Sequence, residues 1–169
     1  MNPYWIEAAG EWRLAILPRP RGNDWLPDDI AAAHRAGVDV IVSALTHAEA
    51  QELGLAEEQE CCARSGIEYL SFPIEDRSLP ASANDLADFL DGLHAKLQHG
   101  KSIAIRCRAG IGRSSMVCAC LLSKQGISID SAFQKIQAAR GCNVPDTPEQ
   151  RQWVEAFVAR GRTQTLRKP

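Results

Sequence analysis

Short apolar runs alternate with longer amphipathic stretches along this chain, and the alternation predicts strands and helices in turn. Strands are predicted where apolar residues run together, at residues 13–18, 38–45, 67–74 and 101–105. Helices are predicted in the remaining segments, at residues 28–37, 46–54, 55–66, 82–100, 114–126, 128–141 and 147–161. This order favours an α/β fold with a central, mostly parallel sheet that is flanked by helices.

The length and the composition favour one domain. A chain of 169 residues with 45% hydrophobic content is large enough to bury a substantial core. We therefore expect a single domain over residues 1–169. The polar segment at residues 162–169 is expected to be a frayed tail.

The charge and the apolar pattern exclude some classes of partner. A net charge of −2 argues against a general nucleic-acid binder, which is normally basic. No segment approaches the ~18 consecutive apolar residues of a membrane helix. The first residues also lack the basic start and the apolar centre of a signal peptide. We expect a cytoplasmic protein with no nucleic-acid or membrane partner.

The cysteines are predicted to be free thiols in a reducing compartment. They stand at positions 61, 62, 107, 118, 120 and 142. No two of them have C-x-x-C spacing, and the histidines do not cluster with them as zinc ligands would. Cys118 and Cys120 lie inside the apolar run "MVCACLL" and are interpreted as core residues. This pattern predicts no metal site.

The segment "SIAIRCRAGIGRSS", residues 102–115, joins the last predicted strand to a buried helix. In parallel sheets, ligands bind at the carboxyl ends of the strands, where this loop begins. Its backbone N–H groups and the start of the helix can surround an anion of phosphate size. Gly110 and Gly112 permit the backbone angles that such a curved loop needs. The candidate phosphate-binding residues are Arg108, Ala109, Gly110, Ile111, Gly112 and Arg113.

Cys107 lies at the base of this loop and is the candidate nucleophile. A thiol at a helix N-terminus beside arginine has a lowered pKa and is largely thiolate. The planar guanidinium of Arg113 can hold two oxygens of one phosphate. The loop is not a nucleotide P-loop, because no lysine follows its second glycine. A thiolate beneath a phosphate indicates covalent phosphoryl transfer.

These residues resemble a known family. "CRAGIGRS" at 107–114 resembles the H-C-x5-R-[ST] signature of the cysteine-dependent protein tyrosine and dual-specificity phosphatases. "FPIEDRSLP" at 72–80 resembles the general-acid loop of the family, and "VPDTPEQRQWV" at 144–154 the segment with its water-positioning glutamine. Residues 28–55 resemble the small phosphatases of the kinase-associated, cyclin-dependent kinase inhibitor type. The likeness covers residues 12–158, the expected phosphatase core.

The resemblance implies a role for each matching residue. Cys107 would attack phosphorus and form a phosphocysteine, while Arg113 and the loop amides stabilise the equatorial oxygens. Asp76 would protonate the leaving oxygen and later take a proton from the attacking water. Ser114 would donate to the cysteine sulfur, and Gln150 would position the water. No metal or other cofactor is implied.

Each of these roles has a simpler alternative that the sequence leaves open. Asp76 fits a turn, and Ser114 fits a helix cap. Gln150 fits a capping partner at the start of the last helix. Arg108 could contact the substrate or simply be solvated.

One residue departs from the family signature, because Arg106 stands where the family has a histidine. Arginine is also a donor and could support the thiolate, but an unpaired buried charge would distort the site. A phosphate-binding pseudophosphatase that acts as an interaction module therefore stays an alternative. So does a phosphatase for a non-protein ester, although Ala109 and Ile111 replace the lysines found in lipid-directed relatives.

The combined prediction is a metal-independent phosphomonoester hydrolase. Its expected substrate is a phosphoprotein or phosphopeptide carrying phosphotyrosine, with phosphoserine and phosphothreonine as further candidates. Phosphate, vanadate and tungstate are the expected ligands of the site.

Overall fold

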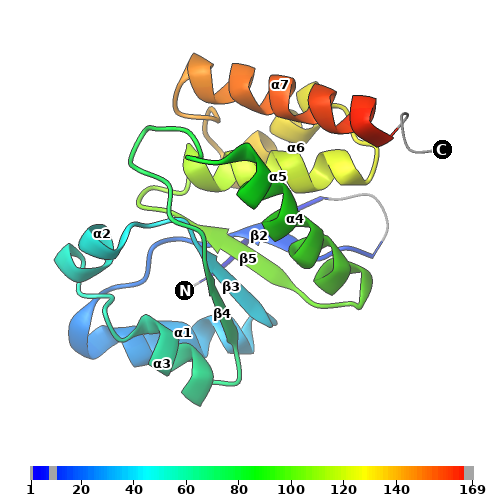
Figure 1. Cartoon of the computed structure of the whole chain (residues 1–169). Coiled ribbons are helices and arrows are strands. Elements are labelled where there is room, and N and C mark those ends of the chain that lie inside the picture. Colours follow the sequence, from blue (N-terminus) through cyan, green and yellow to red (C-terminus); the bar gives the residue numbers. More distant parts are fainter. Residues whose placement is uncertain (1, 8–10, 166–169) are drawn as a thin grey trace.

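The strands form one sheet in the computed structural model, which describes residues 2–7 and 11–165. In sheet order they are β1 (Tyr4–Ile6), β2 (Leu14–Ile16), β5 (Ile103–Arg106), β3 (Val40–Ser43) and β4 (Glu68–Ser71). All neighbouring pairs are parallel except β1 and β2, which are antiparallel (Figure 1). The predicted α/β fold with a mostly parallel sheet is thus confirmed.

Helices cover both faces of the sheet. They are η1 (Asn23–Trp25), α1 (Leu26–Arg35), α2 (His47–Glu52), α3 (Glu58–Arg64), α4 (Ala83–Gln98), α5 (Arg113–Lys124), α6 (Ile129–Arg140) and α7 (Pro148–Thr165). Helices α4 to α7 lie on one face, and α1 and α3 lie on the other (Figure 1). Each predicted helix is present, with ends that differ by a few residues.

Strand β1 was not predicted. Its three residues are too few to show the period-2 alternation by which a strand is recognised. Only Ile6 is buried, while Tyr4 and Trp5 remain partly exposed. The strand forms because it pairs with the edge of β2. This pairing depends on the tertiary structure, and no pattern in the local sequence predicts it.

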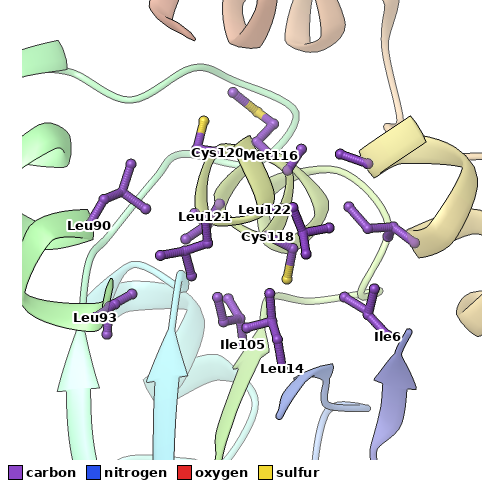
Figure 2. Close-up of a cluster of buried hydrophobic side chains, with 14 of the residues drawn as sticks. Ile6, Leu14, Leu90, Leu93, Ile105, Met116, Cys118, Cys120, Leu121 and Leu122 are labelled. Atoms are coloured by element: carbon purple, nitrogen blue, oxygen red, sulfur yellow. The ribbon is translucent and has the colours of Figure 1, made fainter. Parts of the chain in front are cut away.

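Two apolar clusters hold the layers together, one on each face of the sheet. The larger cluster packs side chains of the sheet against α4, α5, α6 and α7. Figure 2 shows the part of this cluster that surrounds α5. Helix α5 is buried over the ten consecutive residues 113–122, as expected for a central helix. Cys118 and Cys120 are among them, as predicted. Because α5 is enclosed on every side, the loop that precedes it begins and ends at fixed points.

Helix α7 runs past its predicted end at Gly161 and continues to Thr165. Gly161 does not take the left-handed conformation that ends a helix, whereas Gly141 does so after α6, with φ of 69°. Residues 162–165, which the sequence prediction placed in the frayed tail, continue α7, and fraying of the tail stays a prediction. Residues 166–169 lie outside the described residues.

Candidate active site

The cysteine loop leaves the carboxyl end of β5, in the middle of the sheet. β5 ends at Arg106 and α5 begins at Arg113, so the loop occupies the turn between a central strand and the buried helix. Gly112 caps α5 without a side-chain hydrogen bond, which leaves the first N–H groups of the helix directed at the loop. The loop lies where the sequence predicted it.

The sulfur of Cys107 is enclosed and hydrogen-bonded, with only 3% of the residue exposed. The N–H of Gly110 donates to it at 3.3 Å, and Ser114 Oγ lies 3.4 Å away. Burial by itself would raise the pKa of the thiol. The side-chain and backbone hydrogen bonds of Ser114, the charge of Arg113 and the Gly110 amide outweigh burial, so the pKa lies below its ordinary value. The site therefore favours the thiolate.

Arg113 is buried and uses both terminal nitrogens in hydrogen bonds. Its Nη1 donates to Glu49 Oε2 at 2.7 Å and to the carbonyl of Ile74 at 2.8 Å. Its Nη2 donates to Glu49 Oε1 at 2.9 Å and to Asp76 Oδ1 at 2.8 Å. The predicted arginine and the predicted acid therefore meet beside the cysteine loop. Glu49 completes this group.

Glu49 was not predicted as a site residue. On α2 it forms a capping box, in which Thr46 Oγ1 accepts from the Glu49 N–H at 3.2 Å and Glu49 Oε2 accepts from the Thr46 N–H at 3.0 Å. Burial would raise the pKa of this carboxyl, but the hydrogen bonds from Arg113 and Thr46 hold it below its ordinary value. The T-x-x-E pattern is visible in the sequence, whereas its reach to Arg113 depends on the fold.

Asp76 lies in the loop between β4 and α4, and its side chain is 56% exposed. The next residue, Arg77, has a positive φ of 55°, which turns the chain sharply at this point. The turn that the sequence indicated is thus real. Its geometry does not compete with a chemical role, because the Asp76 carboxylate still contacts Arg113.

Gln150 is fully buried at the start of α7. Its N–H donates to Thr147 Oγ1 at 3.2 Å, and its Oε1 accepts from the Thr147 N–H at 3.3 Å, so it caps the helix. Its Nε2 donates to the carbonyl of Ser78 at 3.2 Å, in the same loop as Asp76. A Cβ at Gly112 would lie only 2.7 Å from Gln150 Oε1, which places the amide directly against the cysteine loop. The capping contact is present, and the water-positioning role stays a prediction.

The remaining loop residues differ in their surroundings. Arg108 is exposed, and its Nη2 donates to Glu52 Oε1 at 2.9 Å. Ile111 packs against the larger apolar cluster. Gly110 has φ of 68°, and a Cβ there would lie 3.0 Å from Ile16 Cγ2, so both its conformation and its space favour glycine.

Arg140, at the end of α6, supports the loop from outside and was not predicted. Its Nε donates to the carbonyl of Gly110 at 2.8 Å, and its Nη2 to that of Ala109 at 3.1 Å. Its guanidinium also lies 4.2 Å from the ring centre of Tyr4 in β1. When the N–H groups of the loop face inward, its carbonyl groups face outward. Arg140 donates hydrogen bonds to two of these carbonyls.

Comparison with known proteins decides the family. Residues 31–158 match the family model described as the dual specificity phosphatase catalytic domain. The chain belongs to this family. Its fold also agrees with the crystal structure of kinase associated phosphatase in which the catalytic-site cysteine is replaced by serine, with a TM-score of 0.82, 19% identity and 95% of each chain covered.

Two curated relatives match this chain over part of their length. Phosphatidylglycerophosphate phosphatase PTPMT2 of Arabidopsis thaliana is 30% identical over 92 residues, which are 54% of this chain and 40% of the relative. Human dual specificity protein phosphatase 1 is 29% identical over 83 residues, which are 47% of this chain and 22% of the relative. The matched segments thus span less than half of either relative.

Arg106, where the family signature has histidine, is fully buried in this member of the family. Its guanidinium donates through Nε and Nη2 to the two carboxylate oxygens of Glu58, in α3. Burial lowers the pKa of Arg106 to about 9, which leaves it charged at neutral pH. The buried charge is therefore paired, and the distortion expected of an unpaired arginine has no basis here.

Proposed function

We propose that the protein hydrolyses phosphate monoesters through a phosphocysteine intermediate on Cys107. One observation carries the proposal: the Cys107 sulfur accepts from the Gly110 amide and lies within reach of Ser114 Oγ at the start of α5. A thiolate held there lies beneath a loop that can bind phosphate. Arg113 and Asp76 stand beside it and supply the other groups that the reaction needs.

In the first step, the thiolate attacks phosphorus as the bond to the ester oxygen breaks. The phosphate dianion takes the place of Asp76 on Arg113. The freed Asp76 carboxylate takes up a proton from solvent and delivers it to the leaving oxygen. Arg113 and the loop N–H groups stabilise the charge on the equatorial oxygens. Glu49 keeps the guanidinium in place throughout, because its contacts come from a different element.

In the second step, water attacks the phosphocysteine and the Asp76 carboxylate takes its proton. The sulfur–phosphorus bond breaks, and its electron pair returns to Cys107 as thiolate. Ser114 Oγ, 3.4 Å from the sulfur, stabilises this leaving thiolate. Gln150 is assigned the positioning of the water. Its Oε1 lies against Gly112, next to the space where the phosphate would be bound.

The proposed substrate is a phosphoprotein with phosphotyrosine, and with phosphoserine or phosphothreonine as further targets. Membership in the dual specificity phosphatase family supports this choice. A non-protein phosphoester is the second candidate, because one relative is named a phosphatidylglycerophosphate phosphatase. Ala109 and Ile111 offer no lysine charge to a polyphosphorylated headgroup, which favours the protein substrate. No helix in the described ranges is long and apolar enough to cross a membrane, and the cytoplasmic location stays a prediction.

Turnover by the purified protein tests the proposal. An aryl phosphate, phosphotyrosyl and phosphothreonyl peptides, and vesicles containing phosphatidylglycerophosphate are compared in the presence of a chelator. We expect hydrolysis that vanadate inhibits and that Cys107→Ser abolishes. Loss of all turnover on chelation would contradict the metal-independent mechanism. Binding of tungstate without turnover of any substrate would establish the pseudophosphatase alternative.

A further inference from the structure

Each arginine within residues 106–113 is paired with a glutamate from the α2–α3 segment. The pairs are Arg113 with Glu49, Arg108 with Glu52, and Arg106 with Glu58. They differ most in burial. The side chains of Arg106 and Glu58 are 0% and 1% exposed, whereas those of Arg108 and Glu52 are 42% and 61% exposed. The most deeply buried pair is therefore that of Arg106, the residue before Cys107, with Glu58.

Glu58 is directed inward by its position on α3. It shares one face of this short helix with Cys61 and Cys62, three and four residues further on, and all three are buried. Its side chain makes its hydrogen bonds to Arg106 Nε and Nη2. Within the described part of the chain, no other side-chain hydrogen bond to Glu58 is present. A change at Glu58 therefore acts on the site through Arg106.

Arg106 is held at both its backbone and its side chain. Its carbonyl accepts from the N–H of Ala44 at 2.9 Å, and its guanidinium is fixed by Glu58. Neighbouring Ala104 on the same strand belongs to the smaller apolar cluster, so Arg106 projects toward the α1–α3 side of the sheet. Its Nη1 is buried without a hydrogen-bond partner in the described residues. Apolar side chains could fill this position without the cost of burying two charges. Packing alone therefore does not explain the charged pair.

We propose that Glu58 is a positioning residue of the active site: it fixes the guanidinium of Arg106, the residue before Cys107, on the α1–α3 side of the sheet and cancels its charge. This inference rests on the proposed function, because it treats Cys107 as the nucleophile. Arg106 interacts electrostatically with Cys107. A lone buried guanidinium at this position would stabilise the thiolate further and so make it a poorer nucleophile. With Glu58 in place, the thiolate depends mainly on Arg113, Ser114 and the loop amides.

Besides Arg106 and Glu58, other charged groups act on the thiol or on its two neighbouring arginines and must stay unchanged in a test. Arg113 of α5 acts on the thiol itself. Arg19 of the segment after β2 and Glu49 of α2 act on Arg106, and Glu49 and Asp76 of the loop after β4 act on Arg113. The Cys118 thiol of α5 is also close enough to interact with Cys107. Replacing Glu58 by glutamine removes one negative charge from this set and keeps the side-chain shape.

The test measures the pH dependence of iodoacetamide alkylation at Cys107, followed by mass spectrometry of its peptide. We expect Glu58→Gln to move the alkylation midpoint down by about one pH unit, and Arg106→Met to move it up. The lower midpoint should also slow turnover ~3-fold at neutral pH, because nucleophilicity falls with thiol pKa. Glu60→Gln is the matched control. It removes the same charge from an exposed position on α3 and should leave the midpoint and turnover unchanged.

A second variant keeps the test decisive if Glu58→Gln does not fold. The double variant Glu58→Leu with Arg106→Met replaces the pair by apolar side chains and should fold with a midpoint close to that of the wild type. An unchanged midpoint in Arg106→Met, or a midpoint in the double variant that differs from the wild type by about one pH unit, would overturn the inference. As long as Cys107→Ser is inactive, either result leaves the proposed function intact. Wild-type turnover in Cys107→Ser would instead refute the proposed function.

Discussion

The cysteine loop and the α2–α3 segment form the two sides of the site, and they differ in charge and in origin. The loop and the residue before it carry their arginines within eight consecutive residues, 106–113. The glutamates that pair with them come from separate turns of two short helices, at positions 49, 52 and 58. One side is built to bind an anion, and the other holds the cations in place.

Arg113 contacts two acids, one from α2 and one from the loop after β4, and these acids differ in exposure. Glu49 is 12% exposed and is tied to α2 by its capping box, while Asp76 is 56% exposed on a loop. An arriving phosphate competes with both for the guanidinium. It can displace the exposed Asp76 far more readily than Glu49. In the proposed mechanism, Asp76 thereby becomes available as an acid, and Arg113 keeps its orientation.

The largest effect is expected at Asp76, the exchangeable acid. Asp76→Asn should slow phosphotyrosine hydrolysis by ~10²–10⁴-fold, the usual worth of general-acid catalysis. An activated aryl ester, which needs no proton on its leaving group, should lose much less. Steady-state rates on both substrates make the comparison. Equal losses on the two would assign Asp76 a structural role only.

A smaller effect is expected at Glu49, the fixed acid. Glu49→Gln should lower turnover by roughly tenfold or more, because misplacing a transition-state donor such as Arg113 is costly. Thr46→Ala is the matched control. It removes the other half of the capping box and should cost about 1 kcal/mol of stability with little change in turnover. Equal turnover losses in both variants would show that helix integrity, and not the hold on Arg113, is what matters.

Glu49 should also contribute to the acid stability of the fold. Its pKa is lower in the folded protein than its ordinary value, so its contribution is present above that value and is lost as pH falls through the folded pKa. Thermal unfolding between neutral pH and pH ~3 measures this. Glu49→Gln should show a shallower loss of stability in that range than the wild type. Parallel curves for the two proteins would contradict the assignment.

The smallest effect is expected for Arg106→His, which restores the residue of the family signature. If Arg113, Ser114 and the loop amides hold the thiolate while Glu58 cancels the charge of Arg106, turnover should change by no more than about tenfold, or ~1.4 kcal/mol in activation free energy. The Cys107 thiol of the wild type should titrate below the free value of ~8.5. A gain above ~100-fold in the histidine form, together with an unperturbed wild-type thiol, would mean that arginine disables the site.

The contrast between the two sides also explains what the sequence could predict. β5, the cysteine loop and α5 follow one another in the sequence. Their apolar runs, glycines and cysteine therefore predicted this side of the site from the sequence alone. Glu49, Glu58 and Arg140 reach their partners across 64, 48 and 30 residues. On short amphipathic helices these residues look like solvated surface, and nothing local distinguishes Glu58 from exposed Glu60. Strand β1 was missed for the same reason, because its pairing is with another segment.

A phosphocysteine on Cys107 is the central claim, and trapping it is the most direct test. Asp76→Asn should slow the water step, so an activated aryl phosphate should load the enzyme with phosphate. The reaction is quenched within its first turnover, and the phosphorylated peptide is identified by mass spectrometry. We expect one phosphate per chain, attached to Cys107, and none in the same variant that also carries Cys107→Ser. Phosphate on another residue, or first-turnover product release with no labelled Cys107, would contradict the mechanism.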